Sequence, residues 1–249
     1  MAVRYGLTRA LDMVERGVDA LTLALFSDDW IDALTARFYS GSSHYAGDEW
    51  NLLGLVDWEE AAVVGHFPPR GRVLVTSAGA GREALALVAR GYEVVATECV
   101  PALHARLRAN LEGAGSATVL LAPPDSAPRG PFAACVVGWS AYTHIAGRAR
   151  REAFLVRVAA ELAPGAPVLV SYLGVPRHGE GARAAAALAT ALRAPFGGRR
   201  IEVGETTLPA CFYRYYAPGE VAAELRAAGY RVVHEAEHPY HHIVALAPE

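Results

Sequence analysis

The sequence predicts an α/β fold in which a mostly parallel sheet is covered by helices on both faces. The first reason is that short apolar runs alternate with helical patterns from Arg72 onward. The second is a helical segment of roughly 70 residues before the first strand. The third is that the last two strands lie too close in the chain for a crossover helix, so they are expected to be antiparallel neighbours.

The first 70 residues are expected to form helices. Six apolar residues repeat at the i, i+4, i+7 spacing of one helical face: Leu7, Leu11, Val14, Val18, Leu21 and Leu25. A second helix over 28–39 follows Ser27, a favourable helix-capping residue. A polar, glycine-containing loop over 40–47 then leads to a third helix over 48–66, which ends at a Pro-Pro pair.

Seven strands and their connecting helices are expected in residues 71–249. The expected strands are 73–75, 93–97, 117–121, 132–138, 168–173, 230–234 and 242–246. The expected helices are 82–90, 101–112, 149–162, 180–193 and 219–228. The proline-rich segment 123–131 should be a loop, and the stretches 200–204 and 212–216 are expected to pair as two further strands.

Composition excludes several classes of function. The net charge of −3 gives no general attraction to nucleic acid or to anionic membranes, so neither is expected as a partner. The absence of lysine excludes a lysine Schiff base, a P-loop lysine and a kinase-type lysine. The three cysteines are too dispersed for a disulfide framework. With no membrane-spanning run and no signal-peptide pattern, we expect a cytoplasmic protein.

A loop of small residues follows the first expected strand. The segment Ser77-Ala78-Gly79-Ala80-Gly81 lets a ligand approach the backbone, and the helix after it offers free N–H groups. Glu98, at the tip of the second strand, is placed to accept hydrogen bonds from ribose hydroxyls. These features predict an adenosine-type ligand at the carboxyl ends of the first two strands. Because Gly79, Gly81 and Ala84 also fit the dinucleotide fingerprint, NAD(P) stays an alternative.

The chain resembles the class I S-adenosylmethionine-dependent methyltransferases of the small-molecule type, from about Gly71 to the C-terminus. The residues that carry the resemblance are Gly79, Gly81 and Glu98, together with Tyr216–Glu220, Ala227–Tyr230 and the closing strand pair. The first family motif reads acid-x-Gly-x-Gly-x-Gly, so Val75 and Ser77 depart from it. The resemblance implies a Rossmann-like, doubly wound sheet of seven strands with an antiparallel last strand. It also implies a helical lid over 1–70, a catalytic domain over 71–249, and S-adenosylmethionine as the cofactor.

The resemblance also implies a set of cofactor-binding residues. They are Tyr39, Tyr45, Ser77, Ala78, Gly79, Gly81, Glu98, Cys99 and Trp139. A tyrosine of the lid, either Tyr39 or Tyr45, would touch the carboxylate of the cofactor, and the backbone of Trp139 would lie along its methionine part. Core packing explains the two tyrosines equally well.

Methyl transfer depends largely on positioning, with a general base when the acceptor carries a proton. His144, on the loop after the fourth strand, is the candidate base, although it equally fits a supporting role for the next helix. Tyr142 on the same loop is a second catalytic candidate. Tyr213, Arg214 and Tyr215 are candidates for an apolar or aromatic acceptor site, and sheet packing explains them equally well.

We therefore expect an enzyme that methylates a small molecule, such as an aromatic or apolar metabolite or natural product. An NAD(P)-dependent oxidoreductase and a non-catalytic cofactor-binding protein remain alternatives. The loop over 138–145 lacks the Asn/Asp-Pro-Pro-Tyr/Phe motif of enzymes that methylate exocyclic nitrogens of DNA bases. No metal site is expected, because His238 and His241 lack completing ligands. Monomer and homodimer are both left open, as is the acceptor.

Overall fold

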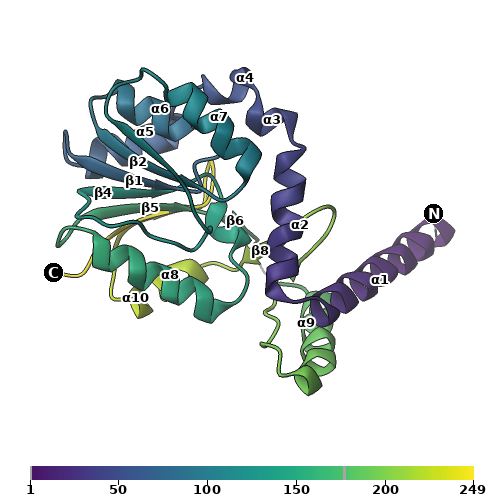
Figure 1. The fold of residues 1–249 in the computed structure, drawn as a ribbon. Helices are drawn as coiled ribbons and strands as arrows, with labels where there is room; N and C mark the ends of the chain where they lie inside the picture. Colours follow the sequence, from purple (N-terminus) through teal and green to yellow (C-terminus); the bar gives the residue numbers. More distant parts are fainter. Residues whose placement is uncertain (1, 176–177) are drawn as a thin grey trace.

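The computed structural model describes residues 2–175 and 178–249, with side chains from residue 14 onward. A seven-stranded sheet lies between two layers of helices, and the N-terminal helices stand at one side of it (Figure 1). The strands are β1 Arg72–Thr76, β2 Glu93–Glu98, β3 Ala117–Leu121, β4 Ala134–Val137, β5 Pro167–Ser171, β9 Arg231–Ala236 and β10 His242–Leu246. Their order is β3-β2-β1-β4-β5-β10-β9.

The direction of the strands agrees with the prediction. Strands β1 to β5 of this sheet pair in parallel, whereas β10 is antiparallel to both β5 and β9. The short connection between β9 and β10 enforces this, since a parallel return needs a crossover of a dozen or more residues. The predicted Rossmann-like sheet with an antiparallel last strand is thus confirmed.

Helices cover both faces of the sheet. They are α1 Ala2–Leu25, α2 Asp28–Ser40, α3 Ser43–Ala46, α4 Asp48–Asn51, α5 Asp57–His66, α6 Arg82–Ala89, α7 Pro101–Leu111, α8 Arg148–Glu161, α9 Glu180–Arg193 and α10 Glu220–Ala227. In Figure 1, α5, α6 and α7 lie on one face of the sheet, and α8 and α10 lie on the other. A small second sheet joins β6 Leu173–Gly174, β8 Tyr213–Tyr216 and β7 Glu205–Thr206.

The central strands are apolar throughout because both of their faces are buried. On β1, Leu74 belongs to the core formed with Phe154 of α8. Its neighbours Val73 and Val75 point to the opposite face and pack in the core that contains Leu87 of α6. Alternate residues of one strand therefore hold the two helical layers, and the sheet presents a rigid edge to the loops after it.

Three predicted elements are wrong in detail. The single helix expected over 48–66 is two helices, α4 and α5, because Gly54 between them has a φ of 77°, which a continuous helix excludes. The short helix α3 lies within the expected loop over 40–47. In the second sheet, β8 pairs with Glu205–Thr206 and not with 200–204.

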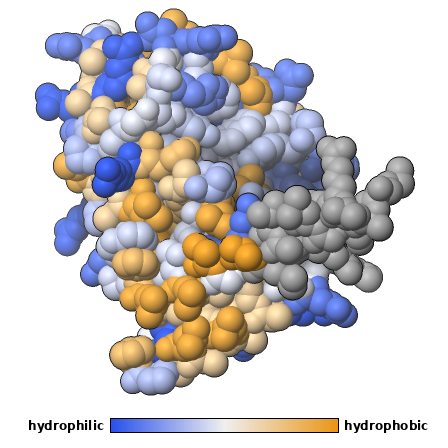
Figure 2. All heavy atoms as spheres, turned by 90° about the vertical axis from the view of Figure 1, so that its right-hand side faces the viewer, coloured by the Kyte–Doolittle hydropathy of each residue, from blue (hydrophilic) through white to orange (hydrophobic). Residues whose placement is uncertain are grey.

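Helix α1 packs on α9 through a face that carries mostly small side chains. Ala20, Leu23 and Ala24 of α1 are buried with Ala186 and Ala189 of α9. The described members of the predicted apolar repeat, Val14, Val18, Leu21 and Leu25, point the other way and are 48–67% exposed. Leu7 and Leu11 lie outside the described side chains. Apolar side chains gather on this side of the molecule, next to the grey atoms in Figure 2.

Among the residues that the structure describes, no helix has both the length and the apolar character that crossing a bilayer requires.

Candidate functional site

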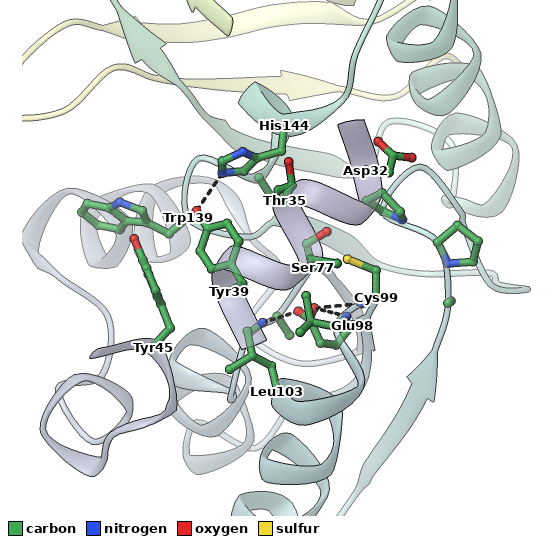
Figure 3. A pocket seen from close by; sticks show the side chains of 18 of the residues that line it. Asp32, Thr35, Tyr39, Tyr45, Ser77, Glu98, Cys99, Leu103, Trp139 and His144 are labelled. Atoms are coloured by element: carbon green, nitrogen blue, oxygen red, sulfur yellow. Dashed lines mark hydrogen bonds between the residues drawn. The ribbon is translucent and has the colours of Figure 1, made fainter. Parts of the chain in front are cut away.

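A cavity of about 440 Å³ opens at the carboxyl ends of β1, β2 and β4, beneath α2. This is the edge of a parallel sheet where ligands bind in open α/β folds. Among the predicted residues, nine line it: Tyr39, Tyr45, Ser77, Ala78, Gly79, Glu98, Cys99, Trp139 and His144. Figure 3 shows Trp139 and Tyr45 on one side of the cavity and Asp32 on the other, with Glu98 and Cys99 between them.

The loop after β1 folds back on the tip of β2. The N–H of Ala78 donates to the carbonyl of Thr97 at 2.9 Å, and the N–H of Gly79 donates to Glu98 Oε2 at 2.7 Å. Gly79 has a φ of 60°, in the left-handed region that favours glycine, and no atom lies within 4 Å of where its Cβ would be. The backbone of Gly79 is therefore open to a ligand in the cavity.

Gly81 serves packing rather than the cavity. It precedes α6 with a φ of 113°, and a Cβ there would lie 2.9 Å from Leu107 Cδ1. Gly81 is absent from the residues that line the cavity. Gly81 thus allows α6 to approach Leu107 of α7, and its predicted contact with the cofactor stays a prediction.

Glu98 is held by backbone groups. Besides Gly79, the N–H groups of Cys99 and Val100 donate to its Oε1 at 2.9 and 2.8 Å. Burial raises the pKa of Glu98, and these hydrogen bonds oppose that rise. A carboxylate has about four lone-pair positions. Three accept backbone N–H groups, and the weak thiol donor of Cys99 faces the carboxylate as well. A ligand hydroxyl has only that weak donor to displace.

Tyr39 and His144 form a hydrogen-bonded pair in the wall of the cavity. The Nδ1 of His144 lies 2.7 Å from the carbonyl oxygen of Phe212, which can only accept, so Nδ1 carries the proton. The Nε2 atom therefore accepts the hydroxyl proton of Tyr39 at 2.8 Å (Figure 3). Burial lowers the pKa of His144 to about 4 and raises that of Tyr39, so both are neutral at pH 7.

This pairing changes the predicted roles of both residues. The only lone pair of the neutral His144 ring is occupied by Tyr39, so Nε2 can take a proton from a substrate only through Tyr39 or after this hydrogen bond breaks, and the role of His144 as a base stays a prediction. The oxygen of Tyr39 keeps lone pairs that can accept a proton donor in the cavity. The tyrosine is thus the accessible member of the pair, and His144 holds it from behind.

Tyr142 and Arg214 lie away from the cavity. The Tyr142 hydroxyl is fully buried and donates to Glu224 at 2.6 Å, which raises its pKa together with burial. Arg214 pairs with Glu224 and Glu202 at 3.2 Å each, and Arg151 binds the same two carboxylates. The structure corrects the predicted catalytic role of Tyr142 and the substrate role of Arg214, because both belong to this buried ionic cluster.

Tyr213 and Tyr215 share the half-buried face of β8, as the predicted alternation requires. The Tyr213 ring centre lies 5.1 Å from that of His144 and 6.5 Å from that of Tyr215. Neither tyrosine lines the cavity itself. Their contact with an acceptor stays a prediction.

Several lining residues were not predicted from the sequence. They are Asp32, Ala33, Thr35, Ala36, Trp50, Glu83, Val100, Leu103, Leu121–Pro124 and Ala141. For some of these residues, the sequence does contain a recognisable spacing. Asp32, Thr35, Ala36 and Tyr39 follow the i, i+3, i+4, i+7 spacing of one face of α2. Because Asp32 and Thr35 are polar, this face does not appear as an apolar repeat. These positions bring α2 over the cavity. Whether the segment 1–70 acts as a lid stays a prediction.

The charged residues in the lining are all acidic. Asp32, Glu83 and Glu98 line the cavity, and the described lining contains no arginine. Burial raises the pKa of Asp32, although Arg150 lies 2.7 Å from its Oδ2 and opposes this. A cavity of this kind favours a ligand with positive charge and disfavours phosphate groups.

The histidines near the last turn include His242, which lies in a cluster of aromatic rings. Within the described residues, no group of three or more histidine, cysteine, aspartate or glutamate side chains has an arrangement that could hold a metal ion. His242 instead stacks on Trp58, with ring centres 4.6 Å apart.

No family model matches the sequence, and no curated protein matches it either. Many solved structures do resemble the fold. An S-adenosylmethionine-dependent methyltransferase from Methanosarcina mazei has a TM-score of 0.60 and 15% identity, covering 79% of this chain and 99% of that one. The CcbJ methyltransferase of Streptomyces caelestis has a TM-score of 0.63 and 18% identity, covering 85% of this chain and 98% of its own.

A third similar structure is the 1,6-didemethyltoxoflavin-N1-methyltransferase of Burkholderia thailandensis, with its substrate and S-adenosylhomocysteine bound. Its TM-score is 0.61 and its identity 17%, over 90% of this chain and 92% of that one. The chain therefore has the fold of the class I S-adenosylmethionine-dependent methyltransferases.

Proposed function

We propose that this protein is an S-adenosylmethionine-dependent methyltransferase that acts on a small molecule. The observation that carries the proposal is the acidic cavity at the carboxyl ends of β1, β2 and β4. S-adenosylmethionine has a sulfonium and an ammonium group, so its charge is complementary to such a lining. The cavity volume of about 440 Å³ is within the range of small-molecule sites.

The rival cofactors fit this cavity less well. NAD and NADP carry a pyrophosphate, which is normally bound by backbone N–H groups and a helix N-terminus. Here Glu83 occupies the first turn of α6 and lines the cavity beside that helix end. A pyrophosphate at this position would meet a carboxylate and no lining arginine. The charge of the cavity therefore favours the methyl donor over a dinucleotide.

The residues of the cavity fit distinct parts of the proposed cofactor. Glu98 would accept a ribose hydroxyl, and the open backbone at Gly79 would allow the ligand to approach the loop. Val100 and Leu103, on one wall, are apolar and suit the flat surface of an adenine ring. When bound, S-adenosylmethionine would supply an electrophilic methyl group.

The chain's own contribution to the chemistry is positioning and proton handling. An acceptor that carries a proton on its nucleophilic atom can donate it in a hydrogen bond to the oxygen of Tyr39. The Tyr39 hydroxyl in turn donates to Nε2 of His144, whose Nδ1–H is fixed by Phe212. The pair thus aligns the acceptor, and because burial lowers the pKa of His144 to about 4, the proton that leaves when the methyl group is gained is not kept on the pair and passes to solvent.

The small molecules bound in similar structures support a small-molecule acceptor. The Burkholderia thailandensis methyltransferase holds 1,6-didemethyltoxoflavin in its structure. A similar O-methyltransferase family 2 protein from Planctomyces limnophilus is in complex with apigenin. Both molecules are planar and aromatic, which agrees with the tyrosine and tryptophan side chains around this cavity.

Calorimetric titration separates the proposal from its alternatives. The purified protein is titrated with S-adenosylhomocysteine and, in parallel, with NADH and NADPH. We expect binding to S-adenosylhomocysteine alone. Binding to a nicotinamide cofactor alone would contradict the proposal. Binding to S-adenosylhomocysteine without methyl transfer to any member of a labelled-methyl metabolite panel would favour a non-catalytic protein.

A further inference from the structure

We propose that Glu83 binds the α-ammonium group of the methionine part of the cofactor; this inference rests on the proposed function. Glu83 lies in the first turn of α6 and lines the cavity, with only 4% of its surface exposed. No prediction from the sequence gave it a role, because glutamate in the first turn of a helix is ordinary.

Two hydrogen bonds fix the orientation of the Glu83 carboxylate. Its Oε1 accepts the backbone N–H of Trp139 at 3.0 Å and an N–H of Arg82 at 2.9 Å. No described residue donates a hydrogen bond to its Oε2. The side chain is thus held rigidly, with one oxygen left for a ligand in the cavity.

The charge around Glu83 is not balanced by the protein. Arg82 is buried and forms two hydrogen bonds with Glu59, at 2.5 and 2.6 Å, besides its bond to Glu83. Two carboxylates therefore share one guanidinium, which leaves a buried excess of one negative charge. Buried charges are normally paired. A cationic group on the ligand would complete the set.

The position of Glu83 selects the ammonium group from the parts of the cofactor. Glu98 lies near the middle of the cavity, and Trp139 lies to one side of it, opposite Asp32 (Figure 3). If Glu98 holds the ribose, the cofactor extends in two directions, with adenine at one end and methionine at the other. The loop after β3, which brings Ala122 and Pro123 into the lining, lies at the other end of the strand order from Trp139 after β4, and its apolar side chains suit adenine. The methionine part would then lie at the end of the cavity beside Trp139, where Glu83 accepts the Trp139 N–H.

The other acidic groups of the cavity are committed elsewhere. Glu98 accepts three backbone N–H groups, and Asp32 is paired with Arg150. Strand β1 offers no carboxylate, because Val75 is apolar and fully buried at the position where the first family motif has an acid. Glu83 is therefore the acid in the lining with both an open oxygen and an unbalanced charge.

The test compares two ligands in two variants. S-adenosylhomocysteine carries the ammonium group, whereas 5′-methylthioadenosine shares its adenosine and thioether but lacks the amino acid. Glutamine in Glu83→Gln keeps an oxygen for the Trp139 N–H and removes the charge. We expect Glu83→Gln to weaken S-adenosylhomocysteine binding about 10- to 100-fold, as for the loss of a charged hydrogen bond, and to leave methylthioadenosine affinity within about twofold.

Glu60→Gln is the matched control, because it makes the same chemical change on α5 at a partly exposed residue that pairs with Arg90 and does not line the cavity. We expect this variant to bind S-adenosylhomocysteine within about threefold of the wild type. An equal loss for both ligands in Glu83→Gln, an equal loss of S-adenosylhomocysteine binding in Glu60→Gln, or no loss at all in Glu83→Gln would overturn the inference. If the wild-type protein binds neither ligand, the proposed function itself fails.

Discussion

Gly138 lies where β4 passes closest to the loop after β1, and replacing it by alanine should disturb both folding and ligand binding. A Cβ at this position would lie 2.4 Å from the carbonyl oxygen of Ser77 and 2.8 Å from that of Thr76. Ordinary van der Waals contact begins at 3.4 Å, so the strand ends would have to separate by about 1 Å. Both atoms belong to the backbone, which cannot turn aside as a flexible side chain does.

The magnitude follows from the cost of overpacking a well-packed interior, about 1–3 kcal/mol. The N–H of Gly138 donates to the carbonyl of Thr76, so this ladder bond would lengthen as well. Ser77 lies two residues before Gly79, whose N–H is bound to Glu98. We therefore expect Gly138→Ala to lower the free energy of unfolding by about 1–3 kcal/mol and to weaken S-adenosylhomocysteine binding in addition.

The assay is urea unfolding followed by circular dichroism, with calorimetry for the ligand. Gly65→Ala is the matched control, because Gly65 is exposed in α5 and no atom lies within 4 Å of its missing Cβ. The same chemical change should there raise stability by about 0.5 kcal/mol, as expected for glycine in a helix. Equal stability of Gly138→Ala and the wild type would refute the close approach of β4 to the loop.

Three further predictions test other parts of the structure. Glu98→Ala should weaken S-adenosylhomocysteine binding by about 1–3 kcal/mol in calorimetry, and unchanged affinity would remove Glu98 from the ligand site. Leu23→Ala, in the buried side of α1, should lower the free energy of urea unfolding by about 2–4 kcal/mol. Leu21→Ala, which is 48% exposed on the same helix, should change it by less than about 1 kcal/mol, and equal effects would contradict the described packing of α1 on α9. The pKa of His144, lowered to about 4, makes the folded protein bind fewer protons than the unfolded chain between about pH 6.5 and 4. The free energy of unfolding should therefore fall by up to about 3 kcal/mol as the pH drops through this window, and a similar fall in His144→Gln would show that another group is responsible.

The centre of the sheet could be predicted because its central strands are buried on both faces. Continuous apolar runs such as 73–75 and 168–173 have few alternatives in a chain of this length, and the short link before His242 fixes the antiparallel end. The break at Gly54 was missed since a glycine in a helical pattern is often tolerated, and only the φ of the folded chain reveals its conformation.

It could also be predicted that Ser77–Gly79 and Glu98 come together at one cavity, because small residues after a strand and a strand-end acid are local signals. The direction in which the side chains point could not be predicted. The alternation over 212–216 indicates that Arg214 lies opposite Tyr213 and Tyr215, but not which face meets a cavity. Tyr142 was placed on the correct loop, yet its partner Glu224 lies 82 residues away in the sequence. Such long-range ionic partners leave no local pattern.

Glu83 is a residue for which the sequence predicts no role, again because its partners are distant in the chain. Its position two residues after Gly81 suggests nothing beyond a favourable charge at a helix start. Its role depends on Glu59, which comes from α5 and shares Arg82 with it. The unbalanced charge becomes visible only when these three side chains are brought together.

The central claim is that the cavity beneath α2 binds an S-adenosyl ligand, and a crystal structure of the protein grown with S-adenosylhomocysteine tests it most directly. We predict electron density for the ligand between α2 and the carboxyl ends of β1 and β2, with a ribose hydroxyl at Glu98 and the amino group beside Glu83. Density for the ligand at another place, or a cavity left without ligand at saturating concentration, would contradict the account.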